Sequence, residues 1–165
     1  MRISRGGVME IKVIIAIILV IALFLFWLIP KLNFARKLKM NQAIFYLVHS
    51  MGILCGLAGL GATIWIGSEI MVKHYFELLM MPLFLCYLFL AILFRIQGED
   101  KVLDEKQNLN MTQAAAFAFV ATLFFSFLLY AVDKSGAWIG LAFFPAFFSF
   151  SIFVYSGATL YYFLR

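Results

Sequence analysis

Residues 43–67 read AIFYLVHSMGILCGLAGLGATIWIG, an apolar run without a lysine, arginine, aspartate or glutamate. About 20 apolar residues suffice to cross a bilayer as a helix, which satisfies its backbone hydrogen bonds internally. The whole chain has the same character. Hydrophobic residues make up 65% of its 165 residues and charged residues 13%, whereas about 25% of the residues in an ordinary soluble domain are charged. The sequence therefore predicts an integral membrane protein.

Four further apolar runs flank this one, at residues 13–29, 75–94, 111–132 and 138–164. We therefore expect an all-α, polytopic transmembrane bundle of five helices, forming a single membrane domain over residues 1–165. No small-x-small cleavage pattern follows the first run, so we expect that run to be retained as a helix. The short link at residues 68–74 predicts that the second and third helices form an antiparallel hairpin.

Lysine and arginine residues predict the orientation, because cytoplasmic loops carry an excess of them. An N-out/C-in topology makes loops 30–42 and 95–110 cytoplasmic, with eight basic residues inside and five outside. Three of those five precede residue 13. Residues 5–9, RGGVM, can be back-translated as a purine-rich stretch before an ATG, like a bacterial ribosome-binding site. A start at Met9 instead of Met1 would strengthen the bias, and we expect a bacterial inner-membrane location.

A short internal repeat suggests how the helices are grouped. Residues 38–43, LKMNQA, and 109–114, LNMTQA, are identical at four of six positions. Each precedes a helical hairpin whose returning helix has an early proline, Pro82 or Pro145. The repeat predicts one helix followed by two hairpins in parallel orientation. Chance similarity between two membrane entry points is an equal alternative.

Small residues form a stripe on the second helix. Gly52, Gly56, Gly59 and Thr63 recur at helical spacing. Helices in lipid associate where small residues let their backbones approach closely. We therefore expect this helix-packing face to lie in the bundle interior or in a dimer interface.

His49 is the candidate polar site, because it shares the face of Gly52 and Gly56 about two turns into the second helix. An ionisable residue at membrane depth suggests function. The alternative is a neutral imidazole that is hydrogen-bonded to a neighbouring helix, near Tyr46 or Ser50.

The link after the second helix carries four polar residues, Glu69, Lys73, His74 and Glu77. The i,i+4 pairs of Lys73 with Glu69 and with Glu77 would support a helix end. A metal site at Glu69, His74 and Glu77 is the less favoured alternative, so we expect no metal and no cofactor. The two cysteines, Cys55 and Cys86, have no metal-ligand spacing.

The segment before the fourth helix reads DEKQNLNMTQAAAF at residues 104–117. It resembles the Asp-Glu-Lys/Arg juxtamembrane motif in families of small multi-pass prokaryotic membrane proteins of unknown function, and the likeness covers about residues 104–132. Those families usually have a lysine where this chain has Gln113. The resemblance implies a multi-pass membrane fold and no particular activity.

No catalytic signature is present: the chain lacks GxSxG, HExxH and Walker motifs and has no acidic residue near the centre of any helix. We therefore expect a non-enzymatic protein, an accessory, immunity-like or regulatory subunit that acts by helix–helix contacts. The alternative is a small-solute or lipophile transporter or channel that acts as an oligomer. The expected partners are the lipid bilayer and either a second copy or another membrane protein, with no nucleic acid. A lipid-exposed glycine stripe would favour the first hypothesis, and a polar row continuing from His49 through the fourth helix the second.

Overall fold

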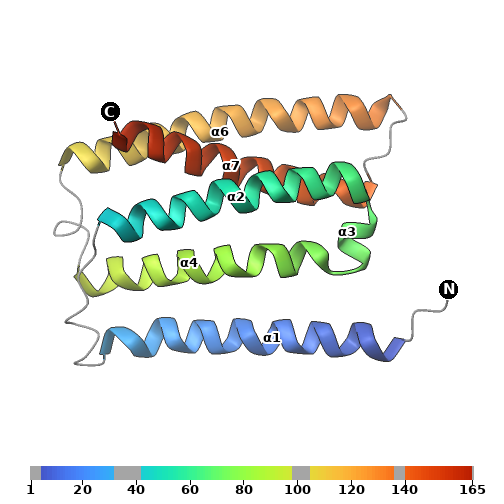
Figure 1. The fold of residues 1–165 in the computed structure, drawn as a ribbon, viewed down its shortest axis with the longest axis horizontal. Coiled ribbons are helices and arrows are strands. Elements are labelled where there is room, and N and C mark those ends of the chain that lie inside the picture. Colours follow the sequence, from blue (N-terminus) through green and yellow to red (C-terminus); the bar gives the residue numbers. More distant parts are fainter. Residues whose placement is uncertain (1–4, 32–41, 98–104, 136–139, 165) are drawn as a thin grey trace.

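The computed structural model describes residues 5–31, 42–97, 105–135 and 140–164 (Figure 1). These residues are almost entirely helical, which confirms the all-α class. The helices are α1 (Arg5–Leu28), α2 (Gln42–Ile66), α3 (Glu69–Val72), α4 (Tyr75–Gln97), α6 (Glu105–Lys134) and α7 (Phe143–Leu164). Short 3-10 turns at Ile29–Lys31 and Gly140–Ala142 follow α1 and precede α7.

Four of the described helical segments are long and apolar enough to cross a membrane. They are Gln42–Ile66, Tyr75–Ile96, Gln107–Lys134 and Gly140–Leu164. In α1, the described apolar segment is shorter and runs from Ala16 to Leu28. A membrane-embedded helical protein is therefore the class that the structure supports.

Several helix ends differ from the sequence expectation. α6 begins at Glu105, six residues before the expected 111, and α4 continues to Gln97 beyond the expected 94. Hydropathy marks where a helix enters lipid, whereas lysine, glutamine and leucine also favour helix in water. The expected loop at 95–110 is therefore mostly helical where it is described. Most of the first repeat copy (38–41) and the expected start of the last helix (138–139) lie outside the described residues.

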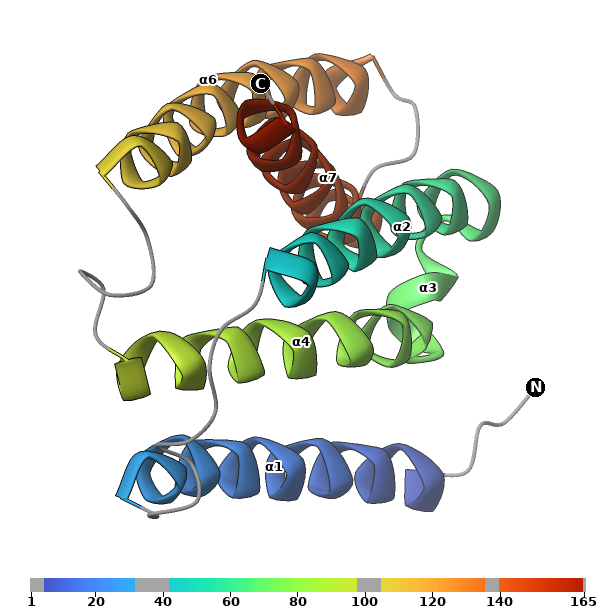
Figure 2. The ribbon, with the colours of Figure 1, turned by 60° about the vertical axis from the view of Figure 1, so that its left-hand side comes forward.

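The helices form two antiparallel pairs. α2 runs antiparallel to α4, and α6 runs antiparallel to α7 (Figures 1 and 2). α2 and α6 begin at the same end of the bundle, which is the arrangement that two parallel hairpins require. α7 packs against both α2 and α6, and α1 lies beside α4. The last helix therefore connects the two hairpins.

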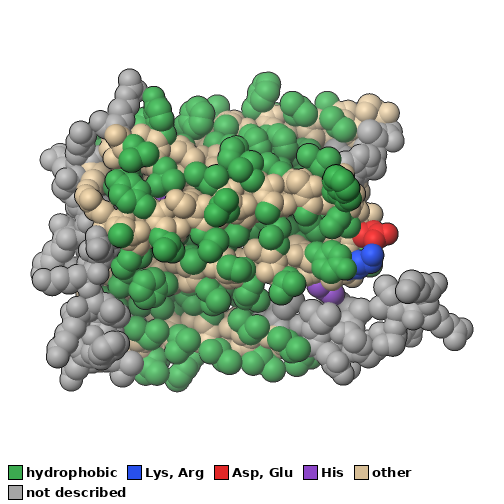
Figure 3. Space-filling model, in the orientation of Figure 1, with side chains coloured by type: hydrophobic (Ala, Val, Ile, Leu, Met, Phe, Trp, Pro, Cys, Tyr) green, Lys and Arg blue, Asp and Glu red, His purple; other side chains and the backbone are tan. Residues whose placement is uncertain are grey.

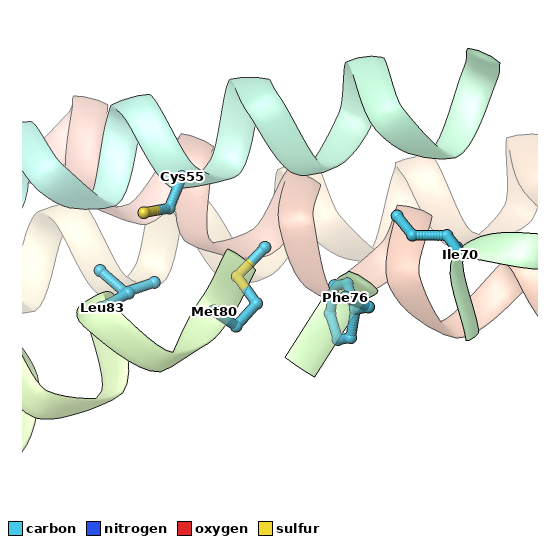
Figure 4. Packing of buried hydrophobic residues seen from close by; sticks show 5 residues of the cluster. All are labelled: Cys55, Ile70, Phe76, Met80 and Leu83. Carbon is cyan, nitrogen blue, oxygen red and sulfur yellow. The ribbon is translucent and has the colours of Figure 1, made fainter. Parts of the chain in front are cut away.

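A cluster of buried apolar side chains joins α2, α3 and α4. It contains Cys55, Ile70, Phe76, Met80 and Leu83 (Figure 4). α3 is a single turn within the link that joins α2 and α4, and its Ile70 is fully buried. This apolar contact holds the start of α4 beneath the end of α2.

The outer surface is apolar along the bundle. Hydrophobic side chains cover the face shown in Figure 3, and the described charged side chains on that face gather at one end. That end carries α3, where Lys73 Nζ lies 2.6 Å from Glu69 Oε2. A long apolar belt with charges at its end is the surface expected of a protein surrounded by lipid.

Candidate functional site

The glycine stripe of α2 lies directly against α7. A Cβ atom added at Gly56 would lie 2.9 Å from the backbone nitrogen of Phe153, and one at Gly52 would collide with Ser156 Oγ. Gly59 is similarly crowded by Ser149 Oγ and by Met80. Only glycine permits this approach of two backbones. The stripe is therefore covered within the chain by its own last helix.

Thr63, the fourth member of the stripe, is 1% exposed and its hydroxyl donates a hydrogen bond of 2.6 Å to the carbonyl oxygen of Gly59. A threonine that bonds one turn back in its own helix needs no partner from a neighbouring helix. Thr63 thus completes the packing face and leaves no polar group exposed to lipid.

His49 is buried among aromatic rings, with only 1% of its surface exposed. Its ring centroid lies 4.4 Å from that of Phe45, 5.9 Å from that of Tyr87 and 5.8 Å from that of Tyr155. The last two residues belong to α4 and α7. The imidazole of α2 therefore lies where three helices meet, and it is enclosed by them.

Tyr87 connects His49 to α7 through its hydroxyl. Tyr87 Oη lies 3.1 Å from Ser156 Oγ, and 3.5 Å from His49 Nδ1 at the outer limit of a hydrogen bond. Among the described residues, His49 Nε2 and the buried Ser149 Oγ have no hydrogen-bond partner. The polar row from His49 thus runs to α4 and α7 and not through α6, the course that would have favoured transport. The contact of His49 with Tyr87 lies on a neighbouring helix, as the alternative of a neutral, hydrogen-bonded imidazole expects.

A cavity of about 650 Å³ lies next to this polar row, between α1, α4 and α7. Ile18 and Leu19 line it from α1, and Tyr87 and Tyr155 carry the polar row into its wall. Most of the remaining lining is apolar, with Phe76, Met80 and Met81 on α4 and Phe148 and Ile152 on α7. Ligand cavities commonly have volumes of about 300 to 1,000 Å³ and are mostly apolar. This cavity has both properties.

One charged residue, Glu77, is among the residues that line the cavity. His74 precedes α4 with a positive φ of 58°, and its Nδ1 donates a hydrogen bond of 3.0 Å to Glu77 Oε1. The other carboxylate oxygen, Glu77 Oε2, is buried and has no hydrogen-bond partner among the described residues. A buried acceptor without a donor is a cost to folding, and because this oxygen is buried, a molecule in the cavity does not reach it in this structure.

The two remaining polar residues of the link bind each other. Lys73 pairs with Glu69 as expected, and this hydrogen bond raises the pKa of Lys73 above its usual value. The second expected pair, of Lys73 with Glu77, is replaced by the contact of Glu77 with His74. No group of three or more potential metal ligands occurs within the described part of the chain.

The sequence reasoning singled out His49 but not the tyrosines around it. Tyr87 lies in the middle of α4, far from either helix end, so it cannot belong to an interfacial aromatic belt. A tyrosine at that depth needs a partner for its hydroxyl. This was the signal in the sequence that could have located the polar row.

Comparisons with known proteins assign no family or function to this chain. No family model matches the chain, and neither a curated protein nor a solved structure matches it. The resemblance of residues 104–132 to uncharacterised multi-pass proteins therefore stays a prediction, and the proposals below depend on the geometry of the site.

Proposed function

We propose that this protein is a five-helix, N-out/C-in protein of a bacterial inner membrane that binds a lipophilic molecule in the cavity between α1, α4 and α7. Four candidate spans support the membrane location. α1 adds 24 helical residues, a length of roughly 36 Å at 1.5 Å per residue, against a hydrocarbon core about 30 Å thick. An odd number of crossings also agrees with the two ends of the described chain lying at opposite ends of the bundle (Figure 1).

The observation that carries the binding proposal is the apolar cavity itself. In a bilayer, a cavity with apolar walls favours hydrocarbon over water, because burying apolar surface is worth about 25 cal/mol per Å². The surface of the cavity is almost entirely apolar, so the bound molecule would be held by its hydrocarbon part. Binding without chemistry fits the absence of a catalytic motif from the sequence, and the protein would hold or transfer its ligand within the membrane.

A second candidate function is that of a subunit acting by helix contacts. The glycine stripe no longer supports it, because α7 covers that face. What favours it is α6, whose membrane-spanning window is only 6% buried and which packs mainly against α7. Its outer face, which includes Phe124 and Phe127, would meet a second copy or another membrane protein.

The binding proposal can be tested with an uncharged alkane that carries a photoactivatable diazirine. The protein is placed in phosphatidylcholine nanodiscs, and the labelled peptides are identified by mass spectrometry. We expect saturable labelling of the α4 and α7 residues that line the cavity, together with weak, non-saturable labelling of outward-facing residues.

The matched variants for this test are Ser151→Phe and Ser50→Phe. Ser151 lines the cavity, whereas Ser50 is exposed on α2. The phenyl ring at position 151 should fill part of the cavity and reduce the saturable labelling severalfold, while the variant at 50 should behave as the natural protein does. Labelling that does not saturate, or that Ser151→Phe leaves unchanged, would rule out the cavity as a binding site.

A further inference from the structure

The place of the cavity along the bundle indicates what fills it. Resting on the proposed cavity binding, we propose that the occupant is an acyl chain of a phospholipid in the membrane leaflet at the α3 end, which the proposed N-out/C-in topology makes the outer leaflet. The chain lies along α4 and α7 and is held by its hydrocarbon part, while its head group stays outside the cavity. This follows from the depth of the cavity, its shape and the nature of its surface.

The cavity covers one half of the candidate membrane span of α4. This span is Tyr75–Ile96, and the lining on α4 begins at Phe76 and ends at Tyr87, next to the middle of the span. On α7 the lining runs from Phe144, whose ring centroid lies 5.8 Å from that of Phe76, to Tyr155. The end at Phe76 adjoins the charged link between α2 and α4. The cavity therefore extends from one membrane surface to the middle of the bilayer.

The length of the cavity matches the chains of one leaflet. Phe76 and Tyr87 are separated by roughly 16 Å along α4, at 1.5 Å per residue. One leaflet contributes about 15 Å to a hydrocarbon core about 30 Å thick. A volume of about 650 Å³ spread over that length gives a mean width of roughly 6 Å, so the cavity is longer than it is wide. An extended chain fits these proportions better than a compact ring system of equal volume.

One face of each helix lines the cavity along this whole length. Lining residues that recur at intervals of three or four lie on one side of a helix. On α4 these are Phe76, Met80, Phe84 and Tyr87, and those on α7 follow the same spacing from Phe144 to Tyr155. A chain in the cavity would therefore contact side chains of both helices at every turn.

The surface of the cavity is almost entirely apolar, and part of its boundary is open. A phospholipid chain can therefore enter while the phosphate and head group remain at the membrane surface. If the cavity stayed empty, the atoms of its lining would lose dispersion contacts. Lipid chains are the most abundant molecules around a membrane protein, so they are the first to fill such a space. A free lipophile has no head group that would restrict it to one half of the membrane.

The test uses two phosphatidylcholines in nanodiscs, each with a photoactivatable diazirine on one acyl chain. One carries the diazirine near the ester and the other near the methyl end, and the labelled residues are identified by fragmentation in the mass spectrometer. We expect the ester-end probe to label Phe144 and the methyl-end probe to label Phe84. Unlabelled dodecane competes for the same cavity and should reduce the labelling of both residues severalfold.

The adjacent residues Phe143 and Leu85 are the matched controls, because both are exposed and neither lines the cavity. Lipids that surround the protein label them at the same two depths, and dodecane should leave this labelling unchanged. A loss confined to Phe144 and Phe84 therefore reports on the cavity and not on the surrounding lipid.

A variant tests how far the chain enters. Ser151 lines the cavity between its two ends, so Ser151→Phe should block the chain at that level. Labelling of Phe84 by the methyl-end probe should fall severalfold. Labelling of Phe144 by the ester-end probe should persist, which also shows that the variant is folded. Ser50→Phe is again the control on the exposed side of α2.

Two results would overturn the inference while saturable labelling by the photoactivatable alkane still supports cavity binding. One is equal labelling of Phe144 and Phe84 by both phospholipid probes. The other is phospholipid labelling of these residues that neither dodecane nor Ser151→Phe reduces. Absence of saturable labelling by the alkane in the natural protein overturns both proposals.

Discussion

Gly56 is the residue where the backbones of α2 and α7 are closest to collision. A Cβ atom there would lie 2.8 to 2.9 Å from three atoms of Phe153, two of them backbone atoms that cannot rotate away. Gly56→Ile should therefore lower the free energy of unfolding by about 1 to 3 kcal/mol, the usual cost of overpacking. Thermal unfolding in mild detergent measures the effect. Leu57→Ile is the control, because Leu57 is exposed, and equal stability of the two variants would contradict the close packing.

Tyr87 offers a second test at the scale of one atom. Tyr87→Phe removes the hydroxyl that contacts Ser156 and His49, and it leaves their buried polar atoms without that partner. We expect a loss of about 0.5 to 2 kcal/mol, the range measured for hydrogen bonds between membrane helices. Tyr130→Phe on the exposed side of α6 provides the comparison in the same thermal assay. A Tyr87→Phe protein as stable as the natural one would show that the polar row contributes nothing to folding.

At the scale of the element, substitution by alanine should change the stability of the protein in opposite directions at two glycines of α2. Gly59→Ala would place a methyl group into Ser149 and Met80, whereas the methyl group of Gly61→Ala meets nothing within 4 Å. The first should destabilise the protein by about 1 to 3 kcal/mol. The second should stabilise it by up to about 1 kcal/mol, because alanine favours helix more than glycine does. Similar effects of the two substitutions, measured by thermal unfolding, would argue against the face assigned to each.

The sequence predicted the elements better than it predicted their assembly. Apolar runs located each helix, with ends that differ from the structure by up to eight residues, because bilayer thickness and helix rise determine how long such a run must be. Small residues at helical spacing likewise indicated which face of α2 packs closely. Neither pattern identified α7 as the helix that covers this face. Which helix packs against α2 depends on the surface shapes of helices that are far apart in the sequence, and the spacing of residues within one helix contains no information about them.

The candidate site was harder to predict for the same reason. His49 stood out as a polar residue in an apolar run, but Glu77 was interpreted as half of a surface ion pair, since Lys73 lies at the favourable i−4 spacing. In the structure Lys73 pairs with Glu69, and Glu77 contacts His74 and forms part of the cavity lining. A cavity formed by three helices exists only after they assemble, so the role of a residue in its lining cannot be read from its neighbours in the chain.

At the scale of the whole molecule, the testable property is the orientation in the membrane. An N-out/C-in protein has Lys134 outside and both Arg95 and Lys106 inside. An alkaline phosphatase fusion after Lys134 should therefore be active, because this enzyme folds only outside the cytoplasm, and fusions after Arg95 or Lys106 should be inactive. The opposite pattern of activities would reverse the orientation. It would also place the Glu77 end of the cavity in the cytoplasmic leaflet.

The contact between α2 and α7 also constrains the order of events during biosynthesis. α2 leaves the ribosome before α3, α4 and α6, yet its glycine face has to wait for α7 before it can be covered. During that interval the glycine face of the nascent chain is exposed, and another membrane helix with small residues could pack against it. A membrane chaperone or the insertion machinery that shields α2 until α7 arrives would protect the chain from this competition, and slower elongation between the two helices would prolong the exposure.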